Sequence, residues 1–114
     1  MRNIAFMLTS EQIRNRSKTV TRRLGWNNLK VGERLQACEK CMGRKHGEPL
    51  VKLAVIEVVS VRREPLDSIL RADENEPTRE GFPLLGRVEF LKVFCEEMKC
   101  QPETEITRIE FKYL

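Results

Sequence analysis

The chain has 114 residues, of which 40% are hydrophobic and 33% are charged. This size is typical of one domain with a single core, so we expect residues 1–114 to form one domain. No segment approaches the ~20 consecutive apolar residues of a membrane-spanning helix, and the N-terminal apolar run is too short for a secretory signal. We therefore expect a cytoplasmic protein that does not act in a membrane.

The net charge of +4 hides an asymmetry between the two halves of the chain. Residues 1–63 contain 14 Lys or Arg and 5 Asp or Glu, a net charge of +9, whereas residues 64–114 contain 7 and 12, a net charge of −5. A basic half attracts ligands that carry phosphate, which favours RNA or a nucleotide as the partner. The alternative is that these charges only keep the surface soluble.

The first half of the chain predicts short strands around one short helix. Apolar residues alternate at Ile4, Phe6 and Leu8, as they do in a strand. Residues 9–12 have the spacing of a capping box, which predicts a helix through Arg14. The other expected elements are extended structure at 19–21, a turn at 29–33, a strand at 34–38 and a polar loop at 43–49.

The strongest strand signal lies at residues 50–61, where both faces are apolar. One face would carry Ala54, Ile56 and Val58, and the other Leu53, Val55, Val59 and Val61, so we expect this strand to be central. Pro65 would end it. After it we expect a helical turn at 66–70 and a polar, mobile loop at 71–79. An amphipathic helix should follow at 86–99, with an apolar face made of Val88, Leu91, Phe94, Cys95 and Met98. The last expected element is a closing strand at 107–113, with a polar face made of Arg108, Glu110 and Lys112.

This order of elements favours a small α+β barrel of about five to six mixed strands flanked by two to three helices, rather than a parallel α/β fold. The sequence contains no P-loop, no dinucleotide-binding glycine motif and no G-x-S-x-G elbow. Neither a nucleoside triphosphatase of the P-loop class nor a hydrolase with that elbow is therefore supported.

The four cysteines raise the question of a metal site. Cys38 and Cys41 form a C-x-x-C pair, Cys95 and Cys100 form a wider one, and His46 is the only histidine. Structural zinc sites usually combine two short pairs, and Cys95 falls on the apolar face of the expected helix. We therefore favour reduced thiols and expect no metal and no cofactor, with a metal or disulfide role as the alternative.

The segment from Asn15 to Trp26 contains four cations, three hydroxyl side chains and one aromatic ring. Arginine matches phosphate with two donors, lysine adds a compact charge, and tryptophan can stack on a base. This combination predicts an anionic, planar ligand such as RNA or a nucleotide. The residues predicted to bind it are Arg16, Thr19, Arg22, Arg23 and Trp26. The alternative for Lys18, Thr21 and Arg23 is an exposed polar strand, and the alternative for Trp26 is a ring at the edge of the core.

Four landmarks resemble the ASCH family, which is related to the PUA domains. They are Lys18-Thr19-Val20-Thr21-Arg22-Arg23 after a short helix, Val31-Gly32-Glu33-Arg34-Leu35, Glu80-Gly81-Phe82 before an amphipathic helix, and Ile109-Glu110-Phe111 near the end. The resemblance implies a PUA-like β-barrel with a cleft beside it that is lined by the Lys-Thr-Arg motif. It also implies that the cleft binds RNA or a nucleotide or modified nucleoside.

One bacterial branch of this family consists of amidohydrolases that remove the acetyl group from N4-acetylcytidine. The resemblance to that branch implies a catalytic set of Lys18, Thr21 and Glu80. Thr21 would attack the amide carbonyl, Lys18 with a lowered pKa would take the hydroxyl proton, and Glu80, kept partly neutral by burial, would protonate the leaving amine. Whether the chain catalyses this reaction or only binds its ligand stays open at this point.

Two conditions follow for the amidohydrolase hypothesis. In one straight strand Lys18 and Thr21 would point to opposite faces, so Lys18 must lie on the turn that precedes the strand. Glu80 follows an acidic loop and must be held in place by Phe82 rather than be solvated. The segment 38–49, with its basic Arg44-Lys45-His46, departs from the short amidohydrolases and favours a larger ligand such as an RNA end or loop.

Overall fold

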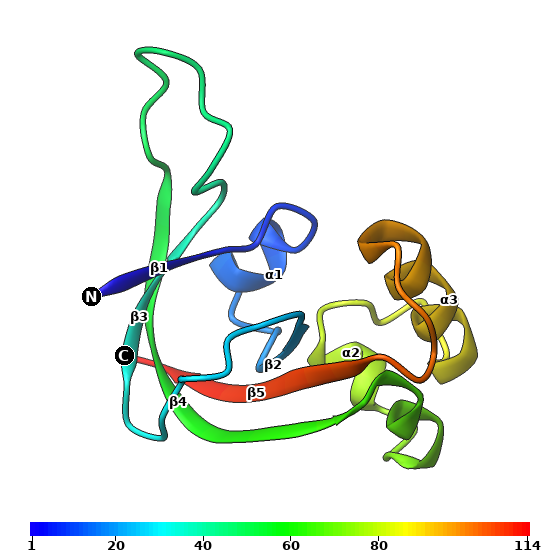
Figure 1. The fold of residues 1–114 in the computed structure, drawn as a ribbon. Helices are drawn as coiled ribbons and strands as arrows, with labels where there is room; N and C mark the ends of the chain where they lie inside the picture. The colour runs from blue at the N-terminus through cyan, green and yellow to red at the C-terminus, as the bar shows by residue number, and fades with distance from the viewer.

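A computed structural model describes residues 1–114 and shows five strands in one mixed sheet (Figure 1). The sheet order is β1-β3-β4-β5-β2, so β4 occupies the central position that its two apolar faces predicted. β1 pairs with β3 in parallel, and the other three pairings are antiparallel. The strands are β1 Arg2–Ala5, β2 Val20–Arg23, β3 Arg34–Cys38, β4 Lys52–Pro65 and β5 Glu105–Tyr113.

The sheet curls into a half-barrel because its long central strand bends. β4 has 14 residues, and its register with β5 shifts at a bulge between Val58 and Ser60. A bulge bends and twists the strand that carries it. The curl brings the two edge strands toward each other, so that Arg23 on β2 donates a hydrogen bond to the carbonyl oxygen of Ala5 on β1. The small α+β barrel predicted from the element order is confirmed.

Short helices lie in two of the connections, between β1 and β2 and between β4 and β5 (Figure 1). The helix predicted to end at Arg14 is present, but the Thr9 side chain makes no capping hydrogen bond, so the capping box is not formed. The predicted loop at 71–79 contains a short helix, with Pro77 in its first turn, where the fixed φ of proline is favourable. The helices are α1 Ser10–Arg14, the 3₁₀ helix η1 Leu66–Arg71, α2 Glu76–Arg79 and α3 Arg87–Met98; none is long and apolar enough to span a bilayer.

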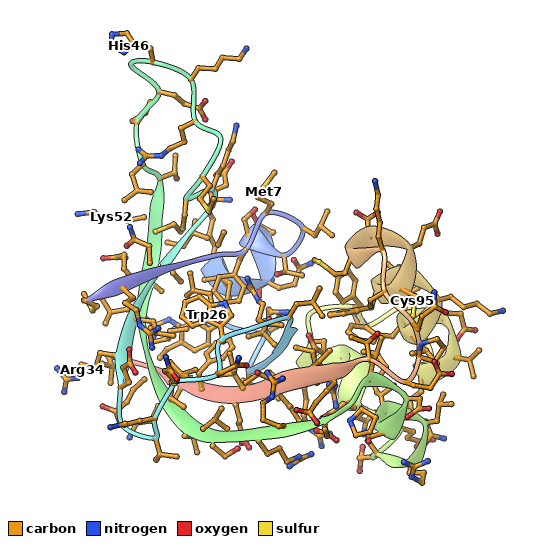
Figure 2. All side chains as sticks on the ribbon, in the orientation of Figure 1. Met7, Trp26, Arg34, His46, Lys52 and Cys95 are labelled. Carbon is orange, nitrogen blue, oxygen red and sulfur yellow. The ribbon has the colours of Figure 1, made fainter.

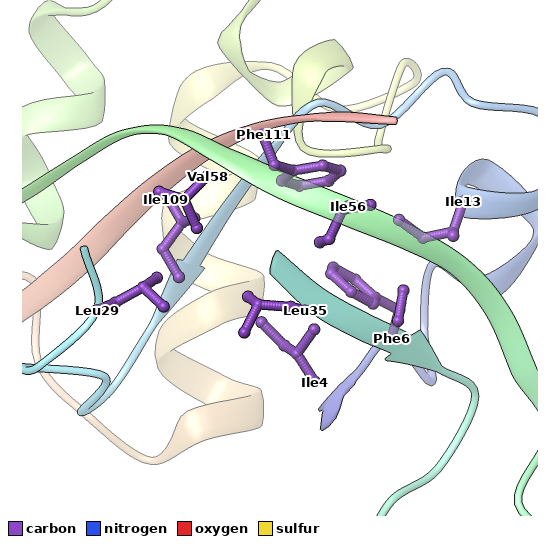
Figure 3. Packing of buried hydrophobic residues seen from close by; sticks show 10 residues of the cluster. Ile4, Phe6, Ile13, Leu29, Leu35, Ile56, Val58, Ile109 and Phe111 are labelled. Atoms are coloured by element: carbon purple, nitrogen blue, oxygen red, sulfur yellow. The ribbon is translucent and has the colours of Figure 1, made fainter. Parts of the chain in front are cut away.

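The main core lies inside the curled sheet and beneath α1 (Figure 3). Ile4 and Phe6 point into it as predicted, whereas Leu8 lies beyond the end of β1 and is 64% exposed. The bulge in β4 explains a second difference: Val59 is exposed, while Val61 on the other side of the bulge packs against the core. The ten buried members are Ile4, Phe6, Ile13, Leu29, Leu35, Ala37, Ile56, Val58, Ile109 and Phe111.

A second cluster joins α3 to the far end of the sheet. Phe90, Leu91 and Phe94 on α3 pack with Leu66 and Ile69 of η1 and Ile106 of β5. The apolar face predicted for this helix was partly wrong, because Val88 and Met98 are largely exposed and Phe90 is buried. The packing holds α3 beside the open seam between β1 and β2.

Candidate functional site

Lys18 lies on the turn between α1 and β2, as the amidohydrolase hypothesis requires. The turn begins at Arg16, whose φ is +63°, and Ser17 donates its N–H to the side chain of Asn15 at 3.0 Å. Two hydrogen bonds fix the backbone of Lys18: its N–H donates to the Gln12 carbonyl at 3.2 Å, and its carbonyl accepts from the Tyr113 hydroxyl. β2 starts only at Val20, so Lys18 and Thr21 do not belong to one straight strand.

The Lys18 side chain enters the interior and contacts Glu80. Its ammonium group donates to the Glu80 backbone carbonyl and lies 3.3 Å from Oε1 of the Glu80 carboxylate. The rings of Phe6 and Phe82 lie within 6 Å, their centroids at 5.8 and 5.9 Å from Nζ. Burial lowers the pKa of Lys18 to about 8, although the charge of Glu80 acts in the opposite direction.

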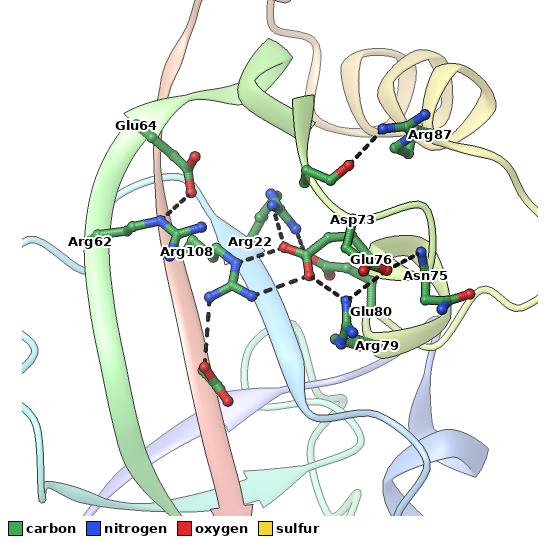
Figure 4. Close-up of polar contacts among 12 residues, drawn as sticks. Arg22, Arg62, Glu64, Asp73, Asn75, Glu76, Arg79, Glu80, Arg87 and Arg108 are labelled. Atoms are coloured by element: carbon green, nitrogen blue, oxygen red, sulfur yellow. Dashed lines mark hydrogen bonds and ion pairs between the residues drawn. The ribbon is translucent and has the colours of Figure 1, made fainter. Parts of the chain in front are cut away.

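Arg22 is buried behind this pair and binds two carboxylates (Figure 4). Nη1 donates to Glu80 Oε2 at 2.9 Å and Nη2 donates to Glu76 Oε2 at 2.7 Å. Its Nε is the one buried side-chain nitrogen or oxygen atom in the protein without a hydrogen-bond partner. Arg22 therefore holds the two glutamates in place, and its Nη groups are not free to receive a phosphate.

Glu76 is the centre of the buried network, and sequence reasoning missed it. Its carboxylate also accepts two hydrogen bonds from Arg108, at 2.7 and 3.1 Å, and lies 3.5 Å from Arg79. Burial by itself would raise the pKa of Glu76, but the hydrogen bonds from Arg108 and Arg22 outweigh this effect and lower the pKa to about 2. Two expectations are thus corrected: the loop at 71–79 is anchored by a buried residue, and Arg108 faces this network rather than solvent.

Thr21 and Arg23 lie next to the Lys18–Glu80 pair. Arg23 Nε donates to the Thr21 hydroxyl oxygen at 3.0 Å, and the guanidinium lies 4.7 Å from the centroid of the Phe6 ring. Burial lowers the pKa of Arg23 to about 10, while Glu80 and Cys41 act in the opposite direction. Lys18 Nζ is bonded to Glu80 rather than to Thr21, so the three proposed catalytic groups are adjacent without forming a continuous chain of hydrogen bonds.

These polar and charged groups border a cavity of about 360 Å³ at the seam between β1 and β2. Lys18, Thr21, Arg22, Arg23 and Glu80 all line it. Its other walls are mainly apolar and come from the β1–α1 connection, where Figure 2 labels Met7, from Phe82 and from α3. The apolar and aromatic wall residues are Ala5, Phe6, Met7, Leu8, Phe82, Phe90, Val93, Phe94 and Met98.

Three residues predicted to bind the ligand lie outside this cavity. Arg16 is exposed and its guanidinium stacks on Tyr113 at 5.4 Å. The Thr19 backbone is paired with Arg79 and Phe111, and Trp26 packs against the main core with Arg2 at 5.1 Å from its ring (Figure 2). The structure therefore groups only four cations and hydroxyls of the 15–26 segment around the cavity, namely Lys18, Thr21, Arg22 and Arg23.

No group of three or more His, Cys, Asp or Glu side chains is placed to hold a metal ion. All four cysteines are free thiols. Burial and the neighbouring Cys41 raise the pKa of Cys38 to about 11, so Cys38 is a poor nucleophile at neutral pH.

Comparison with solved structures decides the fold family. An ASCH domain from Lactobacillus crispatus JV V101 superposes with a TM-score of 0.65 at 15% identity, over 98% of this chain and 78% of that chain. The fold is ASCH-like. The hypothetical protein PH0355 gives a TM-score of 0.64 at 14% identity, over 99% of this chain and 96% of that one.

Protein EF3133 from Enterococcus faecalis V583, which carries the family description DUF984, gives a TM-score of 0.63 at 15% identity, over 100% of this chain and 76% of that chain. No family model and no curated protein matches the sequence itself. Because these identities are low, the similarity shows that the chain has an ASCH-like fold, and any function has to be argued from its own cavity.

Proposed function

We propose that the cavity binds a nucleotide or a modified nucleoside, either free or as part of an RNA strand. The observation that carries this proposal is the mixed lining of the cavity: the polar and charged side chains of Lys18, Thr21, Arg22, Arg23 and Glu80 border it together with aromatic and aliphatic side chains. A nucleobase has apolar faces and hydrogen-bonding edges, so its faces suit Phe82, Phe90 and Met98, and its edge suits Lys18, Glu80 and Arg23. The volume of about 360 Å³ is in the range of small-molecule sites.

A steric block on α3 tests this proposal without touching the charged groups. Val93 lines the cavity, so Val93→Trp should fill it and abolish binding of N4-acetylcytidine, cytidine and cytidine 5′-monophosphate in calorimetry. The matched control is Val88→Trp, which adds the same side chain at an exposed position of the same helix outside the cavity. Equal affinities in the two variants would show that the ligand binds elsewhere, and no binding of any of these probes to the unaltered protein would refute the proposal.

Amidohydrolysis of an N4-acetylcytidine-like nucleoside is the second candidate, and one specific observation favours it. Lys18 has a pKa of about 8, so near neutral pH a fraction of it is an amine that can accept the Thr21 proton. The hydrogen bond from Arg23 to Thr21 Oγ1 stabilises a developing alkoxide. Glu80, which contacts Lys18, would pass the Thr21 proton to the leaving amine as the C–N bond breaks, and water would then hydrolyse the acetyl ester on Thr21 to release acetate.

Acetate release separates the two candidates. Purified protein at high concentration is incubated with N4-acetylcytidine, and the change in ultraviolet absorbance is followed. Turnover that is lost in Thr21→Ala, Lys18→Ala and Glu80→Ala supports the enzyme, and a constant spectrum rules it out for this substrate. In Thr21→Ser the hydroxyl is retained, so partial activity is expected there and not in Thr21→Ala.

A further inference from the structure

The connection between β3 and β4 forms a projecting hairpin, which we call the arm (residues 39–51; Figure 1). At its base the Glu39 N–H donates to the Val51 carbonyl at 2.9 Å. At its tip a turn is closed twice, because the Lys45 N–H donates to the Glu48 carboxylate and the Glu48 N–H to the Lys45 carbonyl, both at 2.9 Å. The arm thus has a defined shape, although its tip residues are exposed.

The tip of the arm carries cations without acidic partners. Both acidic residues of the arm are engaged, Glu39 with Arg14 on α1 at 3.1 Å and Glu48 with Lys40 at 3.6 Å. Arg44 and Lys45 form no ion pair and are exposed, and His46 stands beside them at the tip (Figure 2). Two adjacent free cations on a projecting hairpin attract a polyanion.

The cavity itself offers little to phosphate. Lys18 and Arg22 are both paired with buried carboxylates, which leaves Arg23 as the one cavity cation without a carboxylate partner. A nucleotide whose base enters the cavity therefore needs its phosphates, and those of its neighbours, to be bound elsewhere.

The base of the arm lies next to the cavity. Glu39 ties it to α1, the helix that precedes Lys18. Cys38, the residue directly before the arm, accepts a hydrogen bond from the N–H of Phe6 at 2.8 Å, and Phe6 lines the cavity. In Figure 1 the arm continues β3 and β4 beyond β1 and α1. The base of the arm therefore adjoins the β1 wall of the cavity.

We propose that the arm binds the sugar–phosphate backbone of a single-stranded RNA of which one nucleotide occupies the cavity. This inference rests on the proposed function and narrows its ligand from a free nucleoside to a residue within a strand. Arg44 and Lys45 contact phosphates, and Met42, which is 86% exposed, offers an apolar surface to a flanking base. An acidic protein is a weaker candidate for the arm, because its tip offers only Met42 for apolar burial.

The test compares strand binding with nucleoside binding in the same protein. Anisotropy of a fluorescein-labelled single-stranded RNA of mixed sequence is measured for the unaltered protein and for the double variant Arg44→Glu/Lys45→Glu. We expect the variant to bind at least about tenfold more weakly at low salt, and the slope of log Kd against log salt to fall by about 1.4, the value for two lost phosphate contacts. Its affinity for N4-acetylcytidine in calorimetry should not change, which also shows that it is folded.

The matched control is Lys30→Glu/Lys92→Glu, which makes the same change in net charge at exposed residues outside the arm and the cavity. It should retain most of the RNA affinity. An equal loss of RNA affinity in both double variants, or in neither, overturns the proposal. Failure of the proposed function shows itself separately, as an absence of nucleoside binding in the unaltered protein.

Discussion

Arg22 Nη2 lies 2.7 Å from Glu76 Oε2 in the interior, and the two side chains are only 1% and 3% exposed. Glu76 also binds Arg108, so one carboxylate connects β2, α2 and β5. Through Arg22 the same network reaches Glu80 and then Lys18. The positions of Lys18, Arg22 and Glu80 at the cavity therefore depend on Glu76, which does not line the cavity itself.

Removing the Glu76 carboxylate should destabilise the fold strongly. Glu76→Ala leaves Arg22 and Arg108 as buried charges without this partner, and breaking a buried pair in this way typically costs about 3–5 kcal/mol. Glu76→Gln keeps the shape and one acceptor and should cost less. Urea unfolding measures both, with Glu74→Ala as the control because Glu74 is an exposed neighbour and its loss should change the free energy of unfolding by less than about 0.5 kcal/mol.

The same carboxylate predicts how stability depends on acid. The pKa of Glu76 is lowered from 4.5 to about 2 in the folded protein. Its contribution is thus complete above pH 4.5 and is lost as the pH falls from about 4.5 toward 2, because the unfolded chain takes up the proton first. Unfolding free energies of the unaltered protein and Glu76→Gln should converge in this window. Curves that stay parallel down to pH 2.5 would contradict the assignment.

The lowered pKa of Lys18 predicts how stability depends on pH in the alkaline range. Burial lowers its pKa from 10.5 to about 8, so between pH 8 and 10.5 the unfolded chain holds a proton that the folded protein has released. Stability should therefore rise with pH across this window, relative to Lys18→Met. Nuclear magnetic resonance of ¹³C-labelled lysine should show one Cε signal that titrates near pH 8 and is missing in Lys18→Met. If all lysine signals titrated together near 10.5, the buried position of this amine would be wrong.

Local periodicity was sufficient to predict most of the elements of the sheet. The strand Arg34–Cys38 has its predicted bounds, and the apolar faces of β4 placed it correctly at the centre of the sheet. The bulge after Val58 was not predictable, since it depends on pairing with β5, and it placed Val59 and Val61, which were predicted on one face, in different environments. Similarly, Val88 and Leu91 lie on the same face of an ideal helix, but the residues of α3 that are buried against η1 include Leu91 and Phe90 and not Val88.

The site was predictable only in part, because its partners are far apart in sequence. The family resemblance brought Lys18, Thr21 and Glu80 together, and all three line one cavity; their roles remain predictions. Glu76 could not be found, since it sits in a polar segment and its partners Arg22 and Arg108 are 54 and 32 residues away. For the same reason the sequence shows Arg22 as a free cation, although buried carboxylates occupy it.

Gly81 connects the position of Glu80 to the packing of α1, which gives a further prediction. Its φ is +95°, and a Cβ there would lie 3.0 Å from Thr9 Cγ2 and 3.3 Å from Gln12 Cβ. Gly81→Ala therefore combines backbone strain with a close contact, and either the side chains of Thr9 and Gln12 or the segment carrying Glu80 must shift by a few tenths of an ångström. Gly32→Ala is the matched control, because its φ is +89° and no atom lies within 4 Å of the added Cβ.

Backbone strain alone costs about 1–2 kcal/mol at each position, so Gly81→Ala should lose clearly more unfolding free energy than Gly32→Ala. Because a shift of the backbone at Gly81 also moves the adjacent Glu80, Gly81→Ala should weaken binding of N4-acetylcytidine in calorimetry. Gly32→Ala should leave this binding unchanged. Equal losses of stability in the two variants, with unchanged nucleoside affinity in both, would mean that the contact between Gly81 and α1 does not hold Glu80 at the cavity.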